Sequence, residues 1–185
     1  MPGFAEKTLH TLLDSRRDPE WVRTRRRQAW EMFDAMPMPA LNHEEWRRTD
    51  IRALKLDSFA PAGLDSAGDG RLAKPESFAA HLSKGQFAGS MLQVDGRHAS
   101  VELTDELSKK GVIFCSMDDA VREHPELVEP HFMTRCVDPN YDKFSALHAA
   151  FWCGGAFLYV PRGVKIEQPL YFLTGLSATA SSDLS

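Results

Sequence analysis

Apolar positions in the first part of the chain recur with the spacing of helices. One loose stripe predicts a first helix, and it consists of Phe4, Leu9, Leu12 and Leu13. A second helix is expected from Asp18-Pro19-Glu20, which combines a capping residue, a proline at the first helical position and an acid at the positive helix end. The segment Met36-Pro37-Met38-Pro39 ends it, because proline disfavours helix in the residue before it.

The middle of the chain changes pattern twice. Residues 59–72 include the stretch APAGLDSAGDGR, whose small and polar composition predicts a linker. Further on, Asp95-Gly96 follows an apolar run, and this pair is a strong signal for a tight hairpin turn. A short buried strand is expected at 112–114, and helices are expected at 118–124 and 126–132.

Residues 142–155 are expected to form one more helix. Phe144, Leu147 and Phe151 lie at i, i+3 and i+7, which places them on one helix face. The pair Gly154-Gly155 is expected to end this helix, because glycine accepts the left-handed backbone that closes a last turn.

The segment after this helix predicts short strands joined by tight turns. FLYV is a short apolar run, and VPRG suits a turn with Pro161 at its second position and Gly163 at its fourth. Val164 and Ile166 then alternate with polar neighbours, which is the period of a strand. Short strands of this kind are typical of the opening of a repeating β structure.

The composition is that of an ordinary soluble globular protein, with 43% hydrophobic and 26% charged residues among 185. A net charge of −4 provides no basic field that would favour nucleic acid. No apolar run approaches the roughly 20 residues that span a bilayer, and the amino terminus does not read as a secretory signal. Cys115, Cys136 and Cys153 give no close-spaced pair, so we expect reduced thiols in a cytoplasmic protein.

Arginines concentrate on the predicted second helix, in the run RTRRR at Arg23–Arg27. Phosphate contact or docking on an acidic partner is one interpretation of this run. We favour a solvated helix face near Glu20 and Glu31, because arginines at these positions spread around the helix axis. Arg26 falls on the apolar face, so we expect its stem to be covered while its guanidinium reaches water.

The segment Trp46-Arg47-Arg48-Thr49-Asp50 mixes an aromatic ring, two cations and a carboxylate. We favour a structural role, in which Trp46 is buried and Asp50 caps a turn or pairs with an arginine. The segment would then fix how the helical part joins the residues that follow. A ligand site is the alternative interpretation.

None of the histidines forms a His-x-His or His-x-x-x-His pair. His124, His131 and Cys136 match no common zinc spacing, and we favour surface positions for them. His148, on the last predicted helix, is expected to be a hydrogen-bonded packing residue. Cys153 has no second cysteine near it, whereas iron–sulfur clusters are usually held by several thiolates. We therefore assign no catalytic, cofactor-binding or metal-binding residue.

The segment DKFSALHAAFWCGGAFLYVPRGVKIEQPLYFL, from Asp142 to Leu173, closely resembles the SufB/SufD family of iron–sulfur cluster assembly proteins. Within the family the resemblance is to the SufD side. HEEWRRTDIRAL, from His43 to Leu54, resembles a stretch near the start of SufD-like chains, and Asp95–Phe132 resembles the domain that follows. The resemblance runs from about Phe4 to Ser177. Family members are well over twice this length, and this chain ends where their long β-helix begins.

The resemblance implies an α+β fold in which an amino-terminal helical region and a small α/β region lead into the first rungs of a right-handed parallel β-helix. In the family a helical tail follows the β-helix. We divide the chain into a helical region at 1–58, a linker at 59–75, an α/β region at 76–153 and an incomplete β-helix start at 154–185.

The resemblance also implies a role as a non-catalytic scaffold subunit of the SUF (SufBCD) system. Such a subunit works with a SufB-like scaffold and a SufC-like ATPase to assemble iron–sulfur clusters. The family's partner-binding tail and cluster-handling residues lie late in the chain, at positions that this sequence does not include. We therefore expect no cofactor bound directly by this part. Residues expected to matter for structure or interaction are Trp46, Arg47, Thr49, Asp50, His148, Gly154, Gly155, Pro161 and Gly163.

Two other classes of protein stay open. The segment GGAFLYVPRGV also suits a small metal-dependent β-barrel protein of the cupin type, but no histidine follows His148 to complete such a metal site. The run Arg23–Arg27 also suits a nucleic-acid-binding helical module. Metal analysis would identify the first class, and a steep salt dependence of binding would identify the second.

Overall fold

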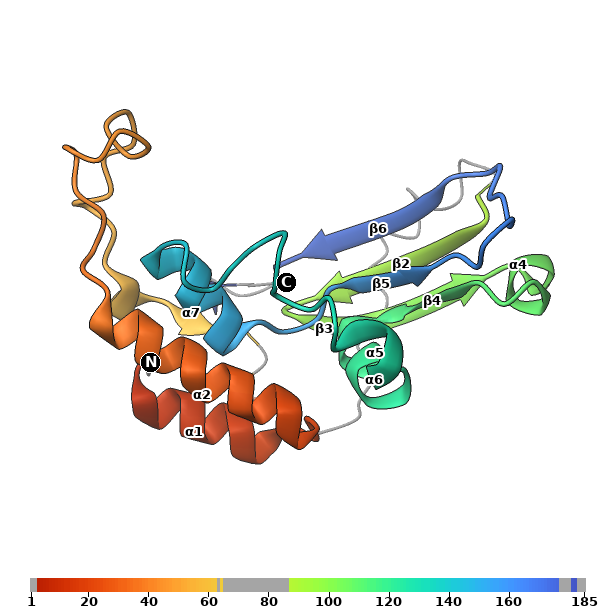
Figure 1. Cartoon of the computed structure of the whole chain (residues 1–185), viewed down its shortest axis with the longest axis horizontal. Coiled ribbons are helices and arrows are strands. Elements are labelled where there is room, and N and C mark those ends of the chain that lie inside the picture. The colour runs from red at the N-terminus through yellow and green to blue at the C-terminus, as the bar shows by residue number, and fades with distance from the viewer. Residues whose placement is uncertain (1–2, 63, 65–86, 177–180, 183–185) are drawn as a thin grey trace.

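The computed structural model describes residues 3–62, 64, 87–176 and 181–182, and it has an α+β fold. Helices α1, α2 and α7 gather at one end of the molecule, and the longer strands extend away from them (Figure 1). In chain order the elements are α1 (Glu6–Ser15), α2 (Glu20–Ala35), the 3-10 helix η1 (Leu56–Ser58), β1 (Ala60–Pro61), β2 (Gly89–Val94), β3 (Arg97–Leu103), α4 (Asp105–Lys109), β4 (Ile113–Ser116), α5 (Met117–Glu123), α6 (Pro125–Val128), α7 (Lys143–Phe151), β5 (Ala156–Tyr159), β6 (Leu170–Gly175) and β7 (Ser181–Ser182).

Helices α1, α2 and α7 pack around one apolar core. Leu12 and Leu13 of α1 are buried there together with Phe151 of α7, as the predicted apolar stripes require. Burying a side chain of this size contributes about 1.5–3 kcal/mol to folding. The ring of Phe151 meets those of Phe4 and Trp30 edge to face, with centroids 5.2 and 5.9 Å away. This core holds α7 in place, and α7 leads directly into the strands.

The start of α2 differs from the sequence-based expectation. Pro19 occupies the N-cap position and the helix begins at Glu20, with no side-chain capping bond. Asp18 is buried instead, and its carboxylate accepts hydrogen bonds from Arg16 and Arg26. The capping role predicted for Asp18 is therefore wrong, because two guanidinium groups occupy its oxygens.

The hairpin predicted at Asp95-Gly96 is confirmed. Strand β2 ends at Val94 and β3 begins at Arg97, so the loop has two residues. Both have positive φ, 51° at Asp95 and 71° at Gly96. Positive φ at both central residues is the geometry of the turn whose twist matches a two-residue hairpin.

The strands form three small sheets in the described residues. One sheet has the order β3-β2-β6, in which β2 pairs antiparallel with β3 and parallel with β6. A second sheet pairs β4 antiparallel with β5, and β1 pairs parallel with β7 in a third. Strands β5 and β6 thus each pair with a strand of the α/β region and not with a further rung. The predicted β-helix is not confirmed by this arrangement.

Most of the predicted linker at 59–75 lies outside the described residues, and so do residues 76–86 of the next region. The described part begins with β1 at Ala60. The proposed division at residues 58, 75 and 153 stays a prediction. In the ranges that the structure covers, no helix combines the length and the apolar character needed to cross a membrane.

Candidate functional site

A buried ionic cluster joins the helices to the strands. We call it the arginine hub, and it consists of Arg16, Asp18, Arg26, Asp118 and Trp152. Its members come from the α1–α2 connection, from α2, from the first turn of α5 and from the residue after α7. The side chain of Arg26 is 0% exposed and that of Asp18 is 1% exposed. The hub is therefore closed to solvent at its centre.

Arg26 connects α2 to the end of α7. Its Nε donates to Asp18 Oδ2 at 2.9 Å, and its Nη1 donates to the backbone oxygens of Ala150 and Trp152 at 3.0 and 2.9 Å. Carbonyl groups at a helix C-terminus lack intrahelical donors, so Arg26 supplies the missing bonds of α7. Its guanidinium also lies over the Trp152 ring, 4.3 Å from the centroid.

Arg16 extends the hub to α5. Its Nε lies 3.3 Å from both oxygens of Asp18, and its Nη2 donates to Asp118. Arg16 also lies 5.5 Å from the Trp152 ring centroid. Asp118 stands in the first turn of α5, where a carboxylate also suits the positive end of the helix. The hub therefore fixes α2, α5 and α7 relative to one another.

Burial and charge act in opposite directions on the two arginines. Burial lowers the pKa of Arg26 to about 10, although Asp18 counteracts it. Burial also acts downward on the pKa of Arg16, but Asp118 and Asp18 outweigh it, so this pKa is raised. Arg26 Nη2 has no hydrogen-bond partner among the described residues, which leaves part of the desolvation cost uncompensated. Removing a carboxylate from this hub would add to that cost.

The expected solvated arginine face is wrong for Arg26, which is fully buried and does not reach water. A snorkelling side chain needs an open path to solvent, and Asp18 and Trp152 close that path. Arg25 donates to the backbone oxygens of Glu129 and Phe132 at 2.9 and 2.8 Å. Arg27 pairs with Glu20 at 3.0 Å. These arginines thus have partners within the chain.

A sharp bend follows α7 and delivers the chain to β5. The helix ends at Phe151, before the glycine pair that was expected to end it. Gly154 and Gly155 have φ of +73° and +95°, and the Gly155 N–H donates to Gln93 Oε1 at 2.6 Å. A Cβ on Gly154 would lie 2.2 Å from the same Gln93 oxygen. The absence of a side chain at these glycines therefore lets the backbone come close to Gln93 of β2. The sequence-based interpretation missed this contact.

The turn at VPRG is shifted by one residue from the predicted position. The N–H of Val164 donates to the carbonyl of Pro161 at 3.1 Å, so Pro161 is the first residue of the turn. Gly163 is then the third residue, with φ of +83°. A positive φ at the third position is the signature of a type II turn and favours glycine there.

Large apolar side chains are exposed on β5, on β6 and on the residues that follow them, and neighbours along a strand point to opposite sides of it. We call this set the open strand face, and its members are Leu158, Tyr159, Val160, Tyr171, Phe172 and Leu176. In the described residues β5 pairs only with β4, and β6 pairs only with β2. Each strand therefore has one edge without a neighbouring strand, and such an edge with apolar side chains favours strand addition.

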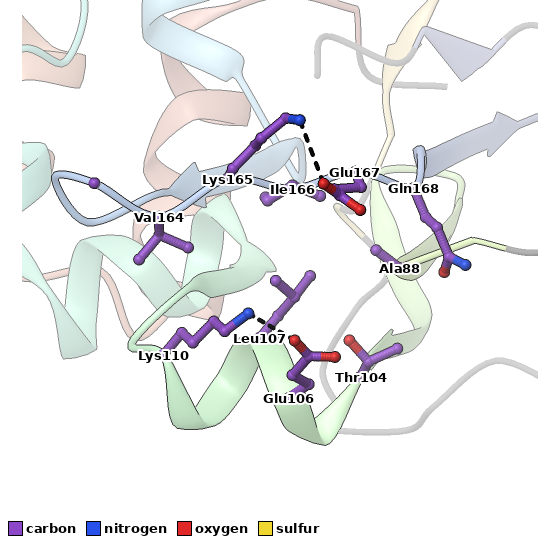
Figure 2. Close-up of a pocket in the computed structure, with 11 residues that line it drawn as sticks. Ala88, Thr104, Glu106, Leu107, Lys110, Val164, Lys165, Ile166, Glu167 and Gln168 are labelled. Atoms are coloured by element: carbon purple, nitrogen blue, oxygen red, sulfur yellow. Dashed lines mark hydrogen bonds and ion pairs between the residues drawn. The ribbon is translucent and has the colours of Figure 1, made fainter.

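A pocket of about 660 Å³ lies between α4 and the segment that joins β5 to β6. Its apolar floor includes Leu107, Val164 and Ile166. Figure 2 shows Lys110 directed to Glu106 and Lys165 directed to Glu167, at 2.6 and 3.3 Å. The charged groups on each wall thus form exposed ion pairs with each other.

The segment Trp46–Asp50 is placed partly as expected. Trp46 is half-buried, and its ring packs on Phe144 with centroids 5.2 Å apart. Asp50 binds the backbone and side chain of Arg52, and these hydrogen bonds lower its pKa to about 2. Arg47 pairs with Glu44 at 3.1 Å. Thr49 is exposed, and its N–H donates to the Trp46 carbonyl at 2.9 Å.

The remaining predicted residues do not converge on one site. His148 is half-buried on α7, and its carbonyl accepts from the Trp152 N–H at 2.7 Å. Cys153 is buried, Cys136 is exposed, and burial together with Asp119 and Glu123 raises the pKa of Cys115 to about 11. Among the described residues no three His, Cys, Asp or Glu side chains gather as a metal site would require.

Sequence reasoning missed the role of Asp18 and Asp118 in the hub, and that of Gln93 at the bend after α7. A signal existed for one of them: Arg26 on an apolar helix face requires a buried carboxylate, and Asp18 is the nearest acid before the helix. Asp118 and Gln93 reach the hub region from distant parts of the chain. No local pattern marks such contacts.

Comparison with known proteins gives one family. Residues 9–172 match the family described as SufBD protein N-terminal region. The iron–sulfur cluster assembly protein SufD of Bacillus subtilis is 33% identical over 168 residues, which cover 89% of this chain and 37% of SufD. SufB of the same organism is 28% identical over 178 residues, with 91% of this chain and 37% of SufB covered. A SufBD family protein of Staphylococcus saprophyticus is 31% identical, with the same coverage as SufB. The chain thus spans little more than a third of these relatives.

Proposed function

The chain belongs to the SufB/SufD family of iron–sulfur cluster assembly proteins, and from this premise we propose that it forms the amino-terminal part of a SufD-like scaffold subunit. The observation that carries the proposal is the match over residues 9–172, with SufD more similar than SufB in the same organism. In this role the chain positions other parts of an assembly and catalyses no reaction itself.

The open strand face supports the proposal. Strand β6 lies parallel to β2 in an unbroken register from Gly89 opposite Leu170 to Val94 opposite Gly175. A further parallel strand can pair with the other edge of β6 and cover the exposed rings of Tyr171 and Phe172. The relatives contain much more chain than this one, and we propose that in the whole protein such strands form a β-helix.

The arginine hub also supports the proposed scaffold role. It holds Trp152 against α2, and beside it Gln93 of β2 binds Gly155, so that the chain enters β5 from a fixed position. Stacked repeats need a rigid terminal unit, because each repeat is stabilised only by its neighbours. We propose that the helices and the hub provide this unit.

The partners and cargo follow from the proposed role. A SufB-like scaffold and a SufC-like ATPase are the proposed partners, and the iron–sulfur cluster is cargo that the full complex handles. No residue of this chain is assigned to the cluster. The proposed compartment is the cytoplasm, where Cys115, Cys136 and Cys153 would remain thiols, as they are here.

A chimera tests this function. Residues 9–172 would replace the matching region of the Bacillus subtilis SufD, and the chimera would be produced in cells that lack SufD. We expect iron–sulfur enzyme activity to be restored, and an Arg26→Met version of the chimera to restore less. A folded chimera that co-purifies with neither SufB nor SufC and restores no activity would contradict the proposal.

A further inference from the structure

The segment between α2 and η1 extends away from the rest of the molecule (Figure 1). We call residues 37–54 the arm, and they contain turns and irregular backbone but no helix or strand. Two contacts attach the arm to the start of α7. The ring of Trp46 lies on that of Phe144, and the Tyr141 hydroxyl donates to Glu45 Oε1 at 2.8 Å. The arm is thus anchored through an aromatic residue and a carboxylate.

A pocket of about 480 Å³ lies between the arm, the exit of α2 and the residues that begin α7. Its walls include two aromatic side chains, Trp46 and Tyr141, and its carboxylates are Glu44, Glu45 and Asp142. The pocket is separate from the arginine hub and from the open strand face. The role proposed for the family does not use it.

The carboxylates that line this pocket outnumber its one ammonium group, that of Lys143, so its charge is negative. Lys143 also lines the pocket, and its ammonium donates to the carbonyls of Phe33 and Met36, both at 2.6 Å, and lies over the Phe33 ring. It therefore serves the carbonyl end of α2. Glu44 pairs with Arg47, but both are more than half exposed, and such pairs are weak.

The two remaining carboxylates have neutral partners. Glu45 accepts one hydrogen bond from a hydroxyl, and Asp142 accepts one from the Ser145 N–H at 2.6 Å. Neither bond neutralises a negative charge. The aromatic rings and the carboxylates together form surroundings that favour a flat organic cation, which stacks on rings and donates to carboxylates.

We propose that this pocket receives an arginine side chain of a partner protein. The guanidinium would stack on Trp46 or Tyr141 and donate to Glu45 or Asp142, as its planar fork of donors allows. Met38 and Leu41 of the arm are exposed by 38% and 39%. Met38 stands between two prolines that line the pocket, and Leu41 stands two residues before His43 of the lining, so we propose that the partner surface has an arginine next to an apolar side chain. The proposal does not rest on the chain's role in cluster assembly.

The test uses the whole chain and the peptide acetyl-Leu-Arg-Leu-amide, followed by nuclear magnetic resonance. Matched peptides carry citrulline, which has the same shape without the charge, or lysine. We expect saturable shifts at Trp46 and Tyr141 with the arginine peptide, weaker ones with lysine and none with citrulline. Glu45→Gln should weaken binding about fivefold, the size of one partly exposed charge pair.

The control is Glu6→Gln, which removes an exposed carboxylate on α1, outside the pocket lining. It should leave the affinity unchanged. The proposal is overturned by the absence of saturable shifts at Trp46 and Tyr141, by equal binding of the citrulline or lysine peptide, or by equal weakening in Glu45→Gln and Glu6→Gln. Chemical shifts of the core helices report whether each variant is folded, independently of binding.

Discussion

The arginine hub includes Trp152, just before β5, and the open strand face begins at Leu158 of β5. The two regions are close in sequence, yet they differ in burial and in the kind of contact they make. In the hub every residue is buried or nearly so, and charged groups meet charged groups or backbone carbonyls. On the open strand face, large apolar side chains such as Tyr171 and Phe172 are exposed by 44% and 40%. The hub completes its interactions inside the chain, whereas the face does not.

This difference indicates that the hub contributes to the stability of the chain, whereas the open strand face favours association. Removing one partner from the hub leaves the other buried charges without a partner, which is costly because the interior solvates them poorly. Changing the face removes only partly buried contacts, so folding should be affected less than by a change in the hub. Substitutions in the two regions should therefore change different measured quantities.

The largest expected effect is on the hub. Arg26→Met removes the donor to Asp18, Ala150 and Trp152, and we expect a loss of about 3–5 kcal/mol in the free energy of unfolding. Urea denaturation measures this quantity. The matched control is Arg27→Met, one residue along the same helix but half-exposed, which should lose less than about 1 kcal/mol. Equal losses in the two variants would show that the hub is not the stabilising element.

The bend after α7 should respond to glycine substitution next most strongly. Gly154→Ala adds a Cβ that meets Gln93 and places alanine at φ of +73°, so we expect a loss of more than about 2 kcal/mol. Gly163→Ala is the control, because its φ is +83° but nothing lies within 4 Å of the added carbon. It should lose only the backbone strain of about 1–2 kcal/mol. A Gly163→Ala loss as large as that of Gly154→Ala would rule out the contact with Gln93.

These glycines also show what the sequence can reveal. Periodicity and turn chemistry are local, so the stripe of α1, the helix face of α7 and the Asp95-Gly96 hairpin were predicted and confirmed. The hub is not local, because Arg16 and Asp118 are 102 positions apart. Capping rules applied to Asp18 failed since they consider neighbours in sequence only.

A third prediction concerns the thiols of the strand region. Cys115 lies on β4 with a pKa raised to about 11, while Cys136 is exposed. At pH 8 a thiol with this pKa has about a hundredfold less thiolate than a thiol with the ordinary pKa of 9.0. Cys115 should therefore react slowly with alkylating reagents. Cys136→Ser should abolish the fast phase of reaction. Loss of the fast phase in Cys115→Ser instead would contradict the assignment.

The same pKa gives the sign of a pH effect on stability. The folded-state pKa of Cys115 is raised above its unfolded value of 9.0, because burial and nearby carboxylates disfavour the thiolate. Its contribution to stability is therefore fully present below pH 9 and is lost as the pH rises through 11. Cys115→Ser should remove this part of the alkaline decrease in the free energy of unfolding.

The smallest expected effect on folding is on the open strand face. Phe172→Ser should lower the free energy of unfolding by about 1 kcal/mol, less than either change above, because 40% of the side chain is already exposed. The same change should reduce self-association of the chain, since exposed apolar strand edges favour association. Light scattering across a concentration series measures this. Unchanged association in Phe172→Ser, with a wild-type chain that does self-associate, would place the contact elsewhere.

Hydrogen exchange of the folded chain tests the central claim most directly, because it reads both regions in one experiment. In the hub region the amides of Trp152 and Gly155 donate within the chain, to His148 and Gln93, and should exchange slowly. In β6, alternate amides face β2 and should be protected, while those between them face the edge that pairs with no described strand and should exchange rapidly. Uniform slow exchange along Leu170–Gly175, or hub amides as fast as the β6 edge, would contradict the account.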